Sequence, residues 1–128
     1  MNRHETREQV VFALYQHLLL KKDVRSAFAN VFEDDISDDY ILQIMLDIEA
    51  HEDQYIEEIG ARLKKWTFDR LNLVEQAILL ETVSEIKQGL NDKAVIIDEA
   101  VILAKEYCDE ESYKYINGIL DHICSSSQ

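Results

Sequence analysis

Proline is absent from this sequence of 128 residues, and glycine occurs only at positions 60, 89 and 118. Because these two residues end most helices and form most tight turns, their scarcity argues against a protein of hairpins and favours helices joined by short polar links. The sequence also lacks any apolar run close to the ~20 residues that a membrane span needs. Its first residues, MNRHETREQ, do not form a signal sequence. We therefore expect an all-α protein that is cytoplasmic and enters no membrane.

The residues that usually build reactive or metal sites are scarce too. Cys108 and Cys124 are spaced like neither a Cys-x-x-Cys pair nor a secreted disulfide framework, which favours a reduced protein. Helical di-metal sites use Glu-x-x-His pairs, but none of the four histidines has a glutamate three residues before it. Glycine-rich phosphate loops and a Gly-x-Ser-x-Gly motif are also missing. The sequence thus predicts no catalytic residue, metal or cofactor, and a binding module rather than an enzyme.

The charge of the chain is strongly acidic but uneven. The formal net charge is −13, from 13 basic and 26 acidic residues. Residues 1–22 hold four of the basic and two of the acidic residues, so their net charge is +2 and that of the remainder is −15. Nucleic-acid binders usually carry a basic surface. Any nucleic-acid contact should therefore use the N-terminal helix, while the acidic body suits a basic protein partner.

The segment 70–89, RLNLVEQAILLETVSEIKQG, is predicted to be a central helix. At 3.6 residues per turn its apolar residues form three stripes rather than one, so other helices must surround it. Asn72 is placed as its N-cap with Glu75 three residues later, and Gly89 is placed just after its last turn. The chain is large enough to bury a core as one domain, residues 1–124, and we expect the Ser-Ser-Ser-Gln tail, 125–128, to be disordered.

The other segments show the amphipathic spacing of helices, for about seven helices in all. We expect helices at 3–22, 23–32, 38–50, 52–65, 94–107 and 112–124. Ser37 is expected to cap the third of these. Gly118 lies in the middle of the last one, where glycine costs about 1 kcal/mol relative to alanine, so we expect close packing there.

One row on the first helix carries basic and aromatic residues at steps of four: Arg3, Arg7, Val11 and Tyr15. The row fits a solvated basic face with Tyr15 half-buried. It also fits a strip that holds phosphates and stacks unpaired bases. The residue types alone leave both interpretations open.

Three segments, taken together, carry a more specific pattern. They are Arg7-Glu8 followed by Ala13-Leu14-Tyr15-Gln16; Trp66 through Arg70-Leu71 and Val74-Glu75-Gln76-Ala77-Ile78-Leu79; and Asp98-Glu99-Ala100-Val101-Ile102-Leu103-Ala104-Lys105 leading to Lys114-Tyr115-Ile116-Asn117-Gly118-Ile119-Leu120-Asp121. In order and spacing, this series resembles the NusB family of bacterial transcription antitermination factors, over essentially the whole chain.

The resemblance implies an all-α fold of two packed helical subdomains that works without catalysis. It implies pairing with the basic ribosomal protein NusE. The pair would bind the boxA element of nascent ribosomal RNA transcripts and, within the RNA polymerase antitermination complex, promote reading through terminators.

Carried over by position, the resemblance also implies site residues. The residues implied to bind RNA are Arg3, Arg7, Tyr15, Lys114 and Tyr115. Glu75 is implied to contact NusE. Glu75 also fits a simple structural role as an acid in the first turn of a helix, where its interaction with the helix dipole contributes about 0.3–1 kcal/mol.

The sequence departs from the family pattern at several positions. His4, Glu5 and Thr6 separate Arg3 from Arg7, where the family has clustered basic residues, and Leu80 replaces an arginine. Fewer phosphate contacts predict weak, salt-sensitive RNA binding without NusE.

Three alternatives to the hypothesis of an antitermination factor stay open. A divergent interaction module with little RNA binding fits the sparse basic row. A NusB-like domain of a ribosomal RNA cytosine methyltransferase is disfavoured, because a cofactor-binding half is lacking. A homodimer could also mask the NusE surface.

Overall fold

The computed structural model describes residues 2–64 and 67–126. Within these ranges, all of its regular secondary structure is helical. The elements are α1 (Arg3–Leu20), α2 (Val24–Val31), α3 (Asp39–Gly60), the single 3-10 turn η1 (Phe68–Arg70), α4 (Leu73–Gln88), α5 (Lys93–Tyr107) and α6 (Glu110–Ser126). The expected all-α class is confirmed. In this described part of the chain, no helix is long and apolar enough to cross a membrane.

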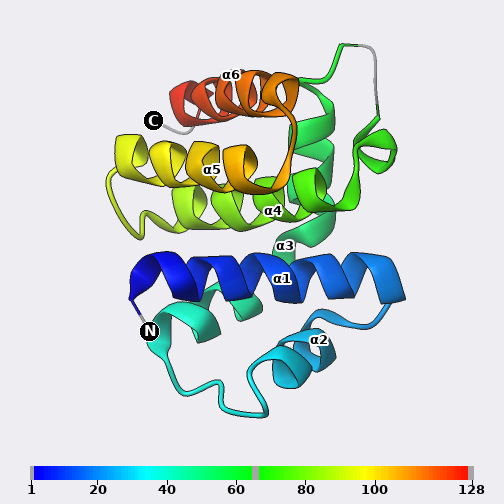
Figure 1. Cartoon of the computed structure of the whole chain (residues 1–128), viewed down its shortest axis with the longest axis vertical. Helices are drawn as coiled ribbons and strands as arrows, with labels where there is room; N and C mark the ends of the chain where they lie inside the picture. The colour runs from blue at the N-terminus through cyan, green and yellow to red at the C-terminus, as the bar shows by residue number, and fades with distance from the viewer. Residues whose placement is uncertain (1, 65–66, 127–128) are drawn as a thin grey trace.

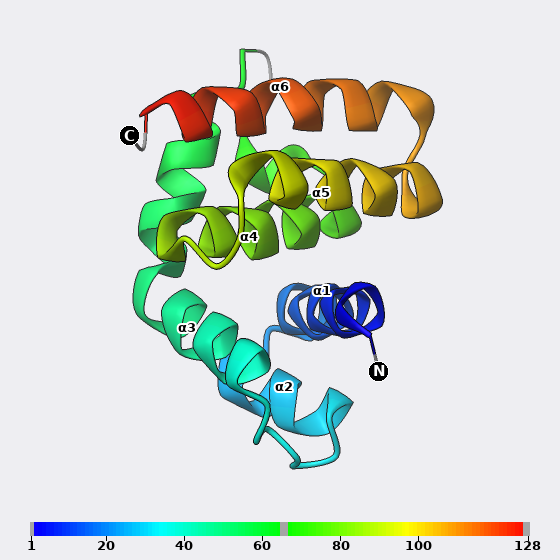
Figure 2. The ribbon, with the colours of Figure 1, turned by 90° about the vertical axis from the view of Figure 1, so that its left-hand side faces the viewer.

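The helices form two packed groups, as expected. In Figures 1 and 2, α1 and α2 lie in one group and α4, α5 and α6 in the other, and the long α3 runs from the first group to the second. The main seam between the groups is the packing of α1 against α4. A single buried apolar cluster continues through both groups, so they share one core.

Helix α4 is the buried axis that its apolar stripes predict. Every residue from Glu75 to Ile86 is buried, polar residues included. Asn72 and Glu75 form the expected capping box, and Gly89 ends the helix in the left-handed conformation, with φ of 65°. Glycine adopts this conformation without a steric cost, which explains its place here.

Several predicted boundaries are wrong. The two helices expected at 38–50 and 52–65 are one, α3, because no residue between them breaks a helix. The cap of α3 is Asp38, whose carboxylate accepts backbone N–H bonds from Tyr40 and Ile41, and not Ser37. Helix α6 ends at Ser126, two residues beyond the expected end at 124, and the expected disorder of the tail stays a prediction. Trp66 and residues 127–128 lie outside the described residues.

Candidate functional site

Arg7, expected on an exposed basic strip, is buried. Only 3% of its side chain is exposed, and the guanidinium makes two parallel hydrogen bonds to the Glu85 carboxylate, with Nε to Oε2 at 2.7 Å and Nη2 to Oε1 at 2.9 Å. Burial opposes its charge, but the bonds to Glu85 raise the pKa of Arg7 above its ordinary value. The expectation of an exposed Arg7 is therefore wrong. Val11, the next member of the row at steps of four, is buried as well.

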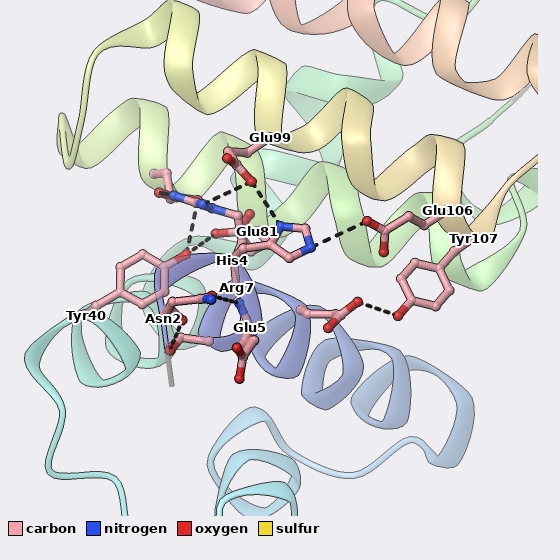
Figure 3. A network of polar contacts seen from close by, with 12 residues as sticks. Asn2, His4, Glu5, Arg7, Tyr40, Glu81, Glu99, Glu106 and Tyr107 are labelled. Carbon is pink, nitrogen blue, oxygen red and sulfur yellow. Dashed lines mark hydrogen bonds and ion pairs between the residues drawn. The ribbon is translucent and has the colours of Figure 1, made fainter.

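The polar cluster around Arg7 joins four helices, since Glu99 of α5 also lies 3.6 Å from Arg7 Nη1 (Figure 3). The Tyr40 hydroxyl of α3 lies 2.8 Å from Glu81 Oε2 and 3.1 Å from Glu85 Oε2. Burial, and then the nearby charge of Glu85, raise the pKa of Glu81 well above its usual range. Arg7 holds the pKa of Glu85 below its usual range despite burial, so Glu85 carries the charge and Glu81 the proton.

The other members of the row have different positions. Arg3 is exposed, and its guanidinium carbon lies 3.9 Å from the centroid of the Tyr40 ring, in cation–π contact. Tyr15 is half-buried and packs against the core. The row is therefore one exposed cation, one buried cation and one half-buried ring, rather than a continuous strip.

Both carboxylate oxygens of Glu75 accept hydrogen bonds from within the chain. Its Oε1 accepts the backbone N–H of Asn72 at 3.1 Å, and its Oε2 accepts a hydrogen bond from the Ser112 hydroxyl of α6. The side chain is 6% exposed. The capping role that the sequence allowed is thus observed, and Glu75 also joins α4 to α6.

A groove of about 1040 Å³ opens beside Glu75. The segment after α3, the start of α4 with η1, and α6 with the residue before it form its walls. The lining residues are Ala61, Arg62, Leu63, Lys64, Arg70, Leu71, Asn72, Glu75, Asp109, Glu111, Ser112, Tyr115, Gly118, Ile119 and His122. The structure thus brings Glu75 and Tyr115, which are 40 positions apart in the printed numbering, to one concave surface.

Tyr115 is half-buried in this groove, and burial followed by the Glu75 carboxylate raises the pKa of its hydroxyl. Lys114 does not line the groove: it is 66% exposed and its only described partner is Glu110 of the preceding turn, 3.8 Å away. A Cβ added at Gly118 would meet no atom within 4 Å, so the expected close packing inside the chain is wrong. Gly118 instead leaves the groove wall open.

Sequence reasoning missed most of the groove. Leu71 and Ile119 have the spacing of core residues, and Ser112 lies where the last helix is expected to begin. Two lining residues carry a signal in the sequence: Glu75, a carboxylate between apolar residues of the central helix, and Tyr115, through the family resemblance. The residues that complete the groove come from segments distant in sequence, so their convergence could not be read from periodicity.

The comparisons with known proteins agree along nearly the whole chain. A model of the NusB family matches residues 4–125. The transcription antitermination protein NusB of Listeria innocua is 38% identical over 125 residues, which cover 96% of this chain and 96% of that protein.

Solved structures give the same picture. NusB of T. maritima is similar with a TM-score of 0.87 and 28% identity, covering 98% of this chain and 92% of that one. A structure of the antitermination factors NusB and NusE in complex with dsRNA is similar with a TM-score of 0.82 and 25% identity, covering 98% and 99%. The sequence pattern, the two helical groups and these likenesses together show that the chain belongs to the NusB family.

Proposed function

We propose that the chain is a non-enzymatic transcription antitermination factor of the cytoplasm. It pairs with ribosomal protein NusE, and the pair binds boxA RNA in nascent ribosomal RNA transcripts and promotes read-through by RNA polymerase. The observation that carries the proposal is the groove joining Glu75 and Tyr115 in a chain with the NusB fold. A relative of the same family is solved in complex with NusE and RNA.

The groove is suited to a protein partner. Its wall combines apolar side chains such as Leu71 and Ile119 with the carboxylates of Asp109 and Glu111 on α6 and its preceding link. An apolar centre with a charged rim is the usual anatomy of a protein interface. The net charge of −13 attracts a basic partner such as NusE over a longer range.

The RNA side of the proposal uses exposed groups near that groove and on α1. Lys114 offers an exposed cation whose described partner is the exposed Glu110, and the neighbouring Tyr115 offers a ring at the edge of the groove. Arg3 and Tyr15 are their counterparts on α1. We assign Arg7 a positioning role: its bonds to Glu85 fix α1 on α4, and through α1 the placement of Arg3 and Tyr15.

The experiment that tests this function measures binding of a boxA RNA to the purified chain, with and without its cognate NusE, at 50 and 200 mM salt. We expect weak binding by the chain alone and stronger, salt-sensitive binding with NusE, because few phosphate contacts are available on this chain. A boxA RNA with a scrambled sequence is the matched control. Equal affinity for the two RNAs, or no gain with NusE, contradicts the proposal.

A second candidate, an interaction module with little RNA binding, is favoured by one observation. Of the two arginines in the N-terminal row, only Arg3 has an exposed side chain. This candidate predicts stable pairing with NusE without a gain in RNA affinity. Sedimentation of the chain alone and with NusE distinguishes pairing from a homodimer that covers the groove.

A further inference from the structure

A histidine and two carboxylates converge between α1 and α5, away from the groove. His4 lies in the first turn of α1, Glu8 one turn later, and Glu106 in the last turn of α5. One ligand atom from each lies within 4.8 Å of the others. The imidazole Nε2 is 3.4 Å from Glu106 Oε1 (Figure 3). Residues four apart on a helix share a face, so α1 supplies two of the three groups from one surface.

Outer partners orient two of these groups. The Nδ1 atom of His4 lies 3.1 Å from Glu99 Oε2, and Glu99 is itself 3.6 Å from Nη1 of the buried Arg7. In the neutral imidazole, an Nδ1–H that donates to Glu99 leaves the lone pair on Nε2, at the other side of the ring. The Tyr107 hydroxyl donates to Glu8 Oε2 at 2.6 Å. A carboxylate behind a histidine is the arrangement that orients metal-binding imidazoles in proteins.

The charges at this place favour a cation. Three carboxylates, Glu8, Glu99 and Glu106, lie around one imidazole, whose Nδ1 is 3.1 Å from Glu99 Oε2 and whose Nε2 is 3.4 Å from Glu106 Oε1. The C-terminal end of α5, which carries Glu106, adds the negative end of a helix dipole.

We propose that His4, Glu8 and Glu106 bind one divalent transition-metal ion of the Zn²⁺ class, and that the ion joins α1 to α5. Imidazole nitrogen with carboxylate oxygen suits Zn²⁺ and its neighbours, whereas Ca²⁺ and Mg²⁺ prefer oxygen alone. Metal bonds of about 2.0–2.2 Å require the three atoms to approach one another by roughly 1 Å. Partly exposed side chains allow this, since His4 and Glu106 are 36% and 40% exposed. Water fills the remaining positions.

The proposal does not depend on the antitermination function. The cluster shares no residue with the groove, and Arg7 connects it only indirectly to α4. A search for Glu-x-x-His pairs misses it, because His4 and Glu8 are four apart with the histidine first, and Glu106 comes from another helix.

The test is calorimetric titration of the untagged, metal-stripped chain with ZnCl₂, combined with thermal unfolding. We expect saturation at one ion per chain and a rise in Tm, since an ion that binds only the folded state stabilises it. His4→Asn and Glu106→Gln should each weaken the affinity at least tenfold and remove most of the Tm rise. Both side chains lie at the surface, and circular dichroism checks that the variants fold.

The matched control is His51→Asn. His51 also faces a carboxylate four residues away, with Nδ1 3.2 Å from Asp47 Oδ1, but no third ligand group joins this pair in the described residues. This variant should bind zinc as the parent does. Absence of saturable binding, an affinity unchanged by His4→Asn, or an equal loss in His51→Asn overturns the proposal.

Discussion

The guanidinium of Arg7 and the carboxylate of Glu85, 78 positions apart, face each other in a buried pair of parallel hydrogen bonds of 2.7 and 2.9 Å. The pair fixes α1 against the central helix. It also removes from the surface an arginine that sequence reasoning placed among the RNA contacts. An arginine in a row of basic and aromatic residues is therefore used here for assembly of the two helical groups.

Arg7→Met should destabilise the fold by about 3–5 kcal/mol, because it leaves the buried Glu85 charge without a partner. Urea unfolding followed by circular dichroism measures the loss. Arg25→Met is the matched control: Arg25 makes the same forked pair with Glu49, but both side chains are exposed, so little change is expected. Similar losses in the two variants would contradict the anchoring role of Arg7.

Lys114→Gln should weaken binding of boxA RNA by the pair with NusE and lower the slope of log affinity against log salt by about one, as loss of one phosphate contact does. The exposed side chain makes a structural effect small. Fluorescence anisotropy over a salt series measures both quantities. Arg25→Gln removes one charge from α2 instead and should leave the slope unchanged. A slope equal to that of the parent would remove Lys114 from the RNA contacts.

Glu75→Gln should keep the helix cap and weaken pairing with NusE. The glutamine oxygen can still accept the Asn72 N–H bond, whereas the charge facing the groove is lost. Glu75→Ala should in addition cost about 1–2 kcal/mol of stability, because the cap and the Ser112 bond are both removed. Calorimetric titration with NusE and urea unfolding separate the two effects. Unchanged NusE affinity in Glu75→Gln would confine Glu75 to its structural role.

In Glu81→Gln, the free energy of unfolding should decrease less with rising pH above 4.5 than it does in the parent. Burial raises the pKa of folded Glu81, so above the ordinary value of 4.5 the unfolded chain releases a proton that the folded chain retains. The free energy of unfolding then declines as the pH rises toward the folded pKa. Glutamine has no proton to release, so the free energy of unfolding of the variant should increase relative to that of the parent as the pH rises. Unfolding at pH 5, 6, 7 and 8 tests this, and parallel curves would contradict it.

The helical class, the central helix and the ends of that helix can all be predicted from the order of the residues. Three apolar stripes can be satisfied only inside other helices, and Asn72, Glu75 and Gly89 act within one or two turns, so local chemistry is enough to place them. The ordered series of motifs also identified the NusB family. Amphipathic spacing does not locate the end of a helix where no residue interrupts it, as the single helix α3 demonstrates.

Which polar side chains remain available at the surface depends on how the helices pack against one another. The same basic residue type is buried at Arg7 and exposed at Arg3. Arg7 lies opposite Glu85 of α4, whereas Arg3 lies over the ring of Tyr40 of α3. The groove at Glu75 and the cluster at His4 are likewise made by segments distant in sequence. Periodicity specifies which residues share a helix face, whereas the packing of helices specifies what that face meets.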